Sequence, residues 1–288
     1  MKFPVKIFLF GSLSAALIAF QWYDPYFSGE SLKGVRVLVT GASTGIGEQV
    51  AYHYARLGAQ IVITARRAHA LNKVSLKCQD LGAQKILYIP ADMASPAEAN
   101  RVVEDAEEQL EGLDYIVLNH IGPSPYRMWD GDVDHMRWLM QVNFHSYVQM
   151  TQKALPALEK SMGSIVVVSS LIGKLCSPYA LPYIATKFAV NGFFGSLQHE
   201  LAMKQSNVSV SVCILGFIDT DSSMEKTKGY IDMRPYPARE AAWQVVKAGA
   251  LRQSEVFYPW YTYYCTLIRD WFPYFRDLVI RNSYNYIP

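Results

Sequence analysis

A tyrosine and a lysine spaced one helical turn apart are the residues best suited to acid–base chemistry. Tyr183 and Lys187 are four positions apart, so on a helix their side chains share one face. Pro182 is tolerated only in the first turn of a helix, which predicts a helix start close to it. An ammonium group beside a phenol lowers the tyrosine pKa from about 10. The pair therefore predicts a general acid or base.

Two further polar positions fit the same chemistry. Ser169 and Ser170 end an apolar segment typical of a strand, and Asn143 lies in a helical segment, 138–147. Parallel sheets bind ligands at the carboxyl ends of their strands. We expect a catalytic group made of Asn143, Ser170, Tyr183 and Lys187. The alternative for Asn143 is an ordinary, hydrogen-bonded helix residue.

A glycine-rich segment, Thr40-Gly41-Ala42-Ser43-Thr44-Gly45-Ile46-Gly47, joins a predicted strand to a predicted helix. Gly41 permits a tight turn, Gly45 permits close approach of a pyrophosphate, and Gly47 permits close packing of the helix on the strand. The start of the helix offers free N–H groups to the phosphates. This context predicts dinucleotide binding, with a purely structural turn as the alternative.

The end of the next strand indicates the type of dinucleotide. NAD sites place an acidic residue there to bind the ribose 2′-hydroxyl. This sequence instead has Arg66 and Arg67, and the next acidic residue is Asp80. A guanidinium group matches a 2′-phosphate, so we expect NADP(H) as the cofactor. The alternative is that both arginines are merely solvated at the start of a helix.

Apolar segments with β-forming residues alternate with helical patterns from residue 34 onward. Continuous apolar segments suit strands that are covered on both faces, and the spacers are long enough for crossover helices. We predict an α/β fold: a Rossmann-type, doubly wound parallel sheet of about seven strands in one domain. The predicted strands are 35–40, 60–65, 86–90, 115–119, 164–169, 208–215 and 256–258.

Composition excludes several classes of protein. The net charge is +2, and 51% of the residues are hydrophobic against 18% charged, so a disordered chain is excluded and no nucleic-acid partner is expected. The four cysteines, Cys78, Cys176, Cys213 and Cys265, form no CxxC pair. We therefore expect no metal site, and we interpret the cysteines as buried free thiols.

The first 30 residues differ from the rest. Lys2 and Lys6 precede an apolar segment, 7–20, and a Trp/Tyr cluster follows it. This pattern fits an uncleaved signal-anchor or a cleaved signal peptide, with a buried N-terminal helix as the third alternative. The charge bias predicts a luminal domain in the endoplasmic reticulum, or secretion after cleavage. The sequon Asn207-Val208-Ser209 fits a luminal glycoprotein.

Aromatic residues and arginines concentrate in the last segment of the chain. Residues 261–288 follow the predicted dinucleotide domain, 31–260, and include Trp271, Phe272, Tyr274 and Phe275. Aromatic side chains interleaved with arginine are typical of a membrane interface or a dimer contact. The alternative is packing over the substrate pocket, where an apolar lid would suit a steroid-sized ligand.

Taken together, these motifs resemble the short-chain dehydrogenase/reductase family, and within it the hydroxysteroid dehydrogenases. The resemblance rests on the glycine-rich turn, Asn119-His120-Ile121, Asn143, Ser170 and the Tyr183/Lys187 pair, and it covers nearly the whole chain. It implies that Tyr183 exchanges the proton and that Lys187 lowers the tyrosine pKa and holds the nicotinamide ribose. It also implies that Ser170 binds the substrate oxygen and that Asn143 holds a water that relays protons to Lys187.

The same resemblance implies a set of cofactor contacts in addition to Tyr183 and Lys187. Two positions depart from the related steroid enzymes, which carry Lys where Thr44 stands and Tyr where Ser177 stands. The implied cofactor residues are Gly41, Ser43, Thr44, Gly45, Ile46, Gly47, Arg66, Arg67, Asp92, Met93, Asn119, His120, Ile121, Ile218, Asp219, Thr220, Asp221 and Ser222.

The function expected from these features is an NADP(H)-dependent oxidoreductase. Its reaction would interconvert a hydroxyl and a ketone on a hydrophobic, steroid-like substrate, and the enzyme would be a membrane-associated homodimer. One alternative keeps the chemistry and changes the substrate to a retinoid, lipid or xenobiotic carbonyl. Another is a catalytically silent nucleotide-binding scaffold, which would tolerate loss of the Tyr183 hydroxyl.

Overall fold

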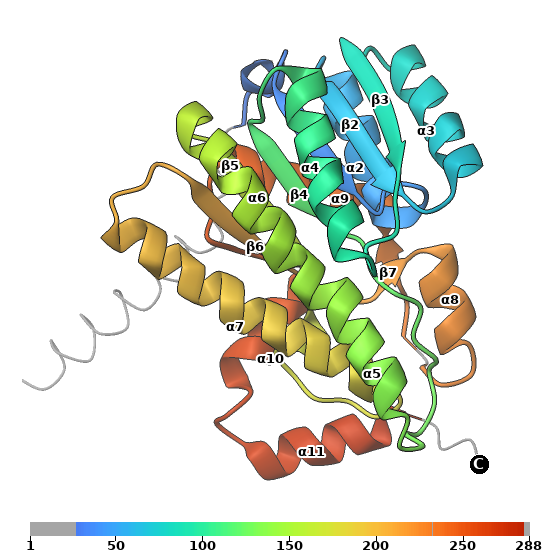
Figure 1. Ribbon diagram of the computed structural model, residues 1–288. Helices are drawn as coiled ribbons and strands as arrows, with labels where there is room; N and C mark the ends of the chain where they lie inside the picture. Colours follow the sequence, from blue (N-terminus) through green and yellow to red (C-terminus); the bar gives the residue numbers. More distant parts are fainter. Residues whose placement is uncertain (1–26, 232, 285–288) are drawn as a thin grey trace, which may run out of the picture.

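Seven parallel strands form the central sheet, in the order β3-β2-β1-β4-β5-β6-β9 (Figure 1). The computed structural model describes residues 27–231 and 233–284. The strand order reverses between β1 and β4, which opens a crevice at their carboxyl ends. The strands are β1 (Arg36–Thr40), β2 (Gln60–Ala65), β3 (Lys85–Pro90), β4 (Tyr115–Leu118), β5 (Ser164–Ser170), β6 (Ser209–Leu215) and β9 (Glu255–Tyr258).

The predicted fold class is confirmed. Each strand of the sheet begins and ends within one residue of its predicted bounds. The reason is that each strand is a strongly apolar segment with polar turns on both sides, which marks its ends clearly. One feature was not predicted. A second sheet of only two short strands, β7 (Ile218–Asp219) and β8 (Tyr236–Pro237), pairs segments on either side of a short helix.

Helices cover both faces of the sheet. One face carries α2 (Gly45–Arg56), α3 (Ala68–Asp80) and α9 (Ala238–Ala250). The other carries α4 (Pro96–Leu110), α5 (Val133–Met140), α6 (Ser146–Ser161) and α7 (Leu181–Met203). In the part of the chain that the structure describes, three shorter α-helices lie toward the C-terminus: α8 (Asp221–Thr227), α10 (Tyr261–Ile268) and α11 (Pro273–Asn282).

Alternation along each strand divides the core into two clusters. In β1, Val37 and Val39 face the side of α2 and α9, whereas Leu38 faces the side of α4 and α6. All three side chains are fully buried. The sheet is thus apolar on both faces, and the polar residues that could bind a ligand lie at the ends of the strands.

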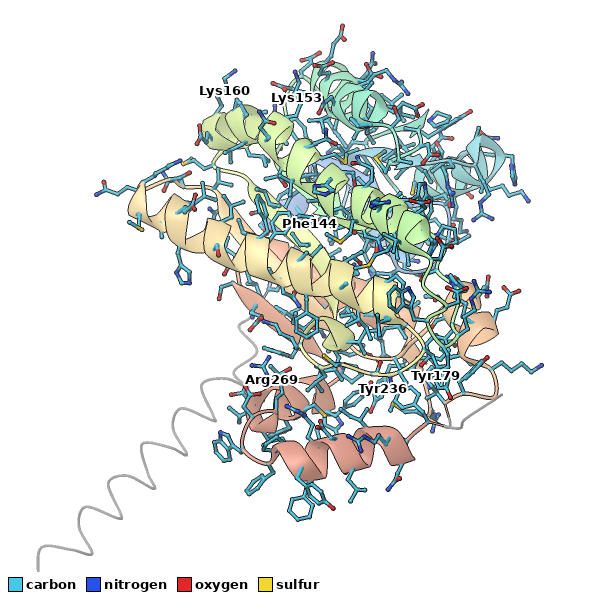
Figure 2. The ribbon with its side chains drawn as sticks, turned by 60° about the horizontal axis from the view of Figure 1, so that its bottom comes forward. Phe144, Lys153, Lys160, Tyr179, Tyr236 and Arg269 are labelled. Carbon is cyan, nitrogen blue, oxygen red and sulfur yellow. The ribbon has the colours of Figure 1, made fainter. Side chains whose placement is uncertain are left out.

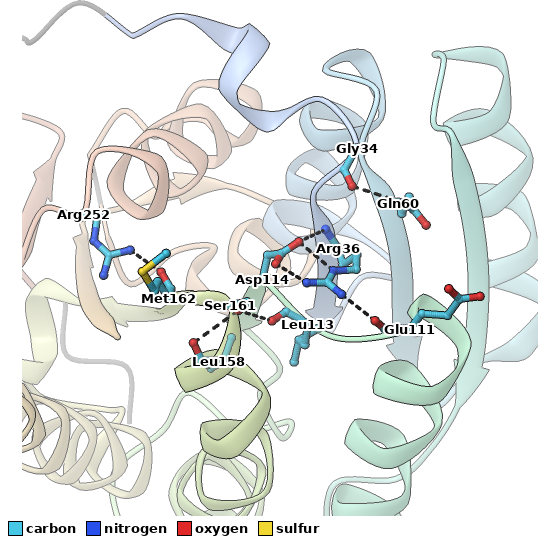
Figure 3. Close-up of polar contacts among 10 residues, drawn as sticks. All are labelled: Gly34, Arg36, Gln60, Glu111, Leu113, Asp114, Leu158, Ser161, Met162 and Arg252. Carbon is cyan, nitrogen blue, oxygen red and sulfur yellow. Dashed lines mark hydrogen bonds and ion pairs between the residues drawn. The ribbon is translucent and has the colours of Figure 1, made fainter. Parts of the chain in front are cut away.

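An ion pair fixes the amino ends of the two central strands. Asp114, just before β4, accepts hydrogen bonds from the backbone and side-chain nitrogens of Arg36 at 2.7–3.0 Å (Figure 3). The Arg36 guanidinium also donates to the backbone oxygen of Glu111 at 2.6 Å. These contacts hold β1 against β4 at the end of the sheet opposite the crevice.

The helix that leads into α6 contains a π-helical turn. Residues Gln141–His145 form this turn between α5 and α6, and Asn143 lies within it, fully buried. A π-turn accommodates one extra residue and commonly occurs at functional sites. The sequence predicted a continuous helical segment here.

The C-terminal helices present apolar side chains to solvent. None of the residues of α11 is buried, and Trp271, Phe272, Tyr274 and Phe275 are all well exposed. Among the described residues, no helix is both long and apolar enough to cross a membrane. The predicted N-terminal signal or anchor falls mostly in residues 1–26, which lie outside the described residues.

The thiol prediction is confirmed in part. All four cysteines are free, and Cys78 and Cys213 are buried. Cys265 is only partly buried and Cys176 is exposed, so the expectation of burial is wrong for Cys176, which lies in the loop before α7. Asn207 of the sequon is exposed.

Candidate active site

Tyr183 and Lys187 lie in the first two turns of α7, which begins at Leu181 with Pro182 in its first turn, as expected. The Lys187 ammonium donates to the backbone oxygen of Val168, in β5, at 2.8 Å. It also lies 5.6 Å from the centre of the Tyr183 ring. The lysine therefore joins α7 to the central sheet and stands beside the phenol.

Burial changes the acid–base properties of this pair. Desolvation lowers the Lys187 pKa to about 7 and raises the Tyr183 pKa well above 10. The physical reason for both shifts is that loss of water penalises the phenolate and the ammonium, the charged forms of the two groups. Burial is thus the dominant influence on the Tyr183 pKa in the described chain, and a lowering of that pKa by Lys187 stays a prediction.

Asn143 is held by two hydrogen bonds. Its side-chain oxygen accepts from the backbone nitrogen of Gly122 at 2.7 Å, and its side-chain nitrogen donates to the Thr186 hydroxyl at 3.1 Å. The asparagine thus joins the loop after β4 to α7 beside the Tyr183/Lys187 pair. A role in a water relay stays a prediction.

Two serines end β5 at the crevice. The Ser170 hydroxyl accepts a long hydrogen bond of 3.4 Å from the backbone nitrogen of Ile172. The Ser169 hydroxyl is buried and has no hydrogen-bond partner among the described residues. A buried hydroxyl without a partner is costly, so the site is suited to a ligand that supplies one.

The glycine-rich turn has the geometry expected of a phosphate cradle. Gly41 and Gly45 have φ angles of 64° and 65°, in the left-handed region that favours glycine. A Cβ atom on Gly47 would overlap the Gly41 carbonyl oxygen and the Asn119 amide. Thr44, the N-cap of α2, makes no side-chain cap bond, so the N–H groups that begin this helix are left to a ligand.

Two arginines follow the end of β2, beside the glycine-rich turn, where a 2′-phosphate would lie. Arg66 and Arg67 follow β2 and are both exposed. The Arg67 guanidinium donates to the Ser43 hydroxyl at 3.3 Å. The glycine-rich turn and a positive charge are thus neighbours, and these residues fit a dinucleotide that carries an additional phosphate.

One cavity of about 330 Å³ brings much of the predicted site together. Its walls combine the carboxyl ends of β4, β5 and β6 with α7, α8 and the C-terminal segment. Figure 2 shows Tyr179 between the body of the domain and α11, whereas Lys153 and Lys160 lie toward the far end of α6. The predicted site residues that line the cavity are Ile46, Asn119, Ile121, Ser170, Tyr183, Lys187, Ile218, Thr220 and Ser222.

The remaining predicted site residues lie outside the cavity wall. Asp92 and Met93 follow β3, and Met93 is buried in the core. Asp219 and Asp221 are exposed on either side of Thr220. The others are Gly41, Ser43, Thr44, Gly45 and Gly47 of the turn, Arg66 and Arg67 after β2, the buried Asn143, and His120.

The side chain of His120 points into the protein. Its ring nitrogens lie 2.8 Å from the Thr40 hydroxyl and 2.7 Å from the Ser146 hydroxyl, and the residue is buried. Burial, together with the charge of Lys187, lowers its pKa to about 3. Both ring nitrogens are occupied by contacts that join β1 to α6. A contact between His120 and the cofactor would therefore have to come from its backbone atoms.

Several wall residues were not predicted. Tyr261 accepts a hydrogen bond from the backbone nitrogen of Phe217 at 2.9 Å, and Tyr284 forms an antiparallel bridge with Ile231. Both tyrosines line the cavity, as do Ser124 and Lys226. The aromatic composition of the C-terminal segment was the only sequence feature that indicated a place in the cavity wall. The path of a long loop produces no periodic pattern in a sequence.

The fold and this site define a short-chain dehydrogenase. Residues 35–231 match the family model described as short chain dehydrogenase, and the chain belongs to this family of NAD(P)-binding oxidoreductases. A solved short chain dehydrogenase from Burkholderia cenocepacia J2315, in complex with NADP, has a TM-score of 0.70 and 25% identity. The match covers 79% of this chain and 97% of that one.

Two relatives carry the name Hydroxysteroid 11-beta-dehydrogenase 1-like protein. The one from Danio rerio is 69% identical over 288 residues, which is all of both chains. The one from Gallus gallus is 59% identical over 251 residues, or 87% of each chain. The resemblance predicted from the motifs is confirmed.

Proposed function

We propose that this chain is an NADP(H)-dependent oxidoreductase that interconverts a hydroxyl and a ketone on a hydrophobic, steroid-sized substrate. The observation that carries the proposal is that Ser170, Tyr183 and Lys187 line one cavity beside the glycine-rich turn. The solved relative with NADP and the names of the curated relatives support the cofactor and the substrate class.

One group of residues would bind the cofactor, and another would bind and protonate the substrate. When bound, the nicotinamide group supplies or accepts a hydride. The α2 N-terminus would hold the phosphates, and Arg66 and Arg67 would hold the 2′-phosphate. Lys187, fixed by Val168, would hold the nicotinamide ribose.

The chain itself supplies the proton and the orientation. Tyr183 would donate its phenolic proton to the oxygen of a ketone, or accept one from an alcohol. Its raised pKa keeps the phenol protonated in the described chain, which suits the donor role in ketone reduction. Ser170 would hydrogen-bond the same substrate oxygen and position it near Tyr183.

The cavity wall supports an apolar substrate. Leu171, Ile172, Leu215 and Phe217 line it together with the catalytic residues. Pockets for lipophilic ligands combine such walls with a few convergent polar groups. Retinoid, lipid and xenobiotic ketones share this chemistry and belong in the same substrate panel.

We also propose the cellular setting expected from the sequence. The N-terminal segment would act as a signal or anchor and place the domain in the endoplasmic reticulum lumen or outside the cell. The exposed aromatic surface of α10 and α11 would contact a membrane or a second copy of the chain. A luminal chain should carry a glycan on Asn207 that an endoglycosidase removes, with a measurable loss of mass. Asn207→Gln tests the luminal location, because this variant should lack both the glycan and the mass change.

The decisive experiment is a comparison of matched tyrosine variants. NADPH oxidation is followed with a panel of ketosteroids and other apolar ketones for the full chain, Tyr183→Phe and Tyr88→Phe. Tyr88 lies in β3, is exposed and is not part of the cavity wall. We expect Tyr183→Phe to lose activity by about a hundredfold or more while it still binds NADPH, and Tyr88→Phe to match the parent.

Two results would contradict this function. Equal turnover by Tyr183→Phe and the parent would remove the tyrosine from the reaction. Tight NADPH binding without turnover of any ketone or alcohol would favour the nucleotide-binding scaffold.

A further inference from the structure

The cavity contains a positive charge that the proposed reaction does not use. Two lysines line it, and no aspartate or glutamate of residues 27–231 and 233–284 is part of its wall. Lys187 is engaged by Val168 and stands beside Tyr183. Lys226 has no assigned role.

Lys226 is held at the wall by the helix that carries it. It is the penultimate residue of α8, and the last turn of this helix is fixed by a 2.8 Å hydrogen bond from the Thr227 hydroxyl to the backbone oxygen of Ser223. Ser223 and Thr227 line the same cavity. The ammonium group is therefore carried by an ordered part of the wall.

The charge on Lys226 is not neutralised within the described chain. No carboxylate of the described residues forms an ion pair with it. Burial lowers its pKa, and the charge of the exposed Glu225, its neighbour in the sequence, offsets part of this effect. Partial desolvation of a cation without a counterion is unfavourable, and an anion entering the cavity would offset that cost.

The rest of the wall indicates what kind of molecule carries this anion. Ile231 and Met233, just beyond α8, line the cavity, and Leu215 and Phe217 precede it. A ligand that fits such walls is mostly apolar, with its reacting oxygen at Ser170 and Tyr183. Among the described wall residues, the cation outside the catalytic group that a second polar group on this ligand would meet is Lys226.

We propose that Lys226 binds an anionic group of the substrate, a carboxylate or a sulfate, so that acidic hydrophobic ketones and alcohols are preferred over neutral ones. This assignment rests on the proposed function, because it concerns the substrate of the same site. The other source of an anion is the cofactor, whose phosphates would lie at the α2 N-terminus, where a Cβ on Gly45 would come within 3.1 Å of Thr220, the N-cap of α8. The experiment must separate the two sources.

The test uses a substrate pair that differs only in charge: a steroid ketone with a side-chain carboxylate and the methyl ester of the same compound. Equilibrium binding of acid, ester and NADPH is measured by protein fluorescence, and kcat/KM is measured for acid and ester. The proteins are the full chain, Lys226→Met, Lys226→Arg and Lys228→Met. Lys228 is the exposed C-cap of α8 and is not part of the cavity wall, which makes it a matched control.

We expect the full chain to bind the acid at least tenfold more tightly than the ester. Lys226→Met should abolish this preference, Lys226→Arg should keep it, and Lys228→Met should resemble the parent. Equal binding of acid and ester by the full chain would overturn the assignment, as would a loss of NADPH affinity in Lys226→Met with the acid preference intact. Because binding is measured without turnover, an inactive protein that still prefers the acid would overturn the proposed reaction and leave the anion site standing.

Discussion

The guanidinium group of Arg67 donates a hydrogen bond to the hydroxyl of Ser43 at 3.3 Å, across the gap between the end of β2 and the glycine-rich turn. Both side chains belong to the region where a dinucleotide's adenosine ribose would lie. The contact is long and exposed, so it adds little stability. Its importance is that it holds a cation at the turn.

Arg67→Ala should weaken NADPH binding and leave NADH binding nearly unchanged, because only NADPH carries the 2′-phosphate. An exposed charge-assisted contact of this kind predicts a loss of about tenfold. Arg101→Ala on α4, also exposed, is the control. Fluorescence titration with both nucleotides measures the effect, and an equal loss for NADH and NADPH would speak against a 2′-phosphate contact.

Stability of the cofactor-free protein should depend on pH through Lys187. Its pKa is about 7 in the folded chain against an ordinary 10.5, so between these values the unfolded chain binds more protons. The free energy of unfolding from this group therefore rises with pH, by up to about 1.4 kcal/mol per unit. The raised pKa of Tyr183 acts in the opposite direction only above its ordinary value of 10.

The measurement is the thermal midpoint of the full chain and of Lys187→Met from about pH 7 to about pH 9. The variant lacks the titrating group, so its midpoint should rise less with pH than that of the parent. Parallel profiles for the two proteins would show that the buried lysine does not titrate in this range.

Gly47→Ala should destabilise the protein by about 2 kcal/mol or more and weaken nucleotide binding, because its methyl group would displace the Gly41 carbonyl or the Asn119 amide. Gly192→Ala is the matched control, since a Cβ at this exposed position of α7 meets no atom within 4 Å. It should instead stabilise the helix by about 0.5–1 kcal/mol. Urea denaturation compares the two, and similar changes in both would contradict the packing argument.

Tyr284→Ala should raise KM for bulky substrates by about tenfold with a smaller effect on kcat, because this residue closes one wall of the cavity. Its ring centre lies 6.3 Å from that of Tyr179, and its backbone pairs with Ile231. Tyr274→Ala, on the exposed face of α11, is the control and should leave KM unchanged. An equal effect of both substitutions would assign the tail a general structural role.

Much of this arrangement was predictable, because it follows from short-range patterns. Continuous apolar segments such as 165–168 gave the strands, and the glycine spacing gave the turn with its two positive φ angles. The separation of four between Tyr183 and Lys187 gave their common face. In each case the determining residues are neighbours in the sequence.

The remaining features depend on contacts between distant segments. His120 is turned inward by Thr40 and Ser146, which are 80 and 26 residues away. The pKa of Tyr183 depends on how completely the fold excludes water, and no residue spacing encodes that. The contribution of Lys226 to the cavity depends on where α8 lies after β6, and that of Tyr284 depends on the path of the chain after α11.

The π-helical turn at Gln141–His145 sets a limit on deletions in this part of the chain. Removing one residue would restore a regular helix and rotate α5 by about 100° relative to α6. The bonds from Asn143 to Gly122 and Thr186 would then break together, since they join two elements that are fixed independently. A length change of a single residue here should therefore be more damaging than most substitutions, even though the helix would gain regularity.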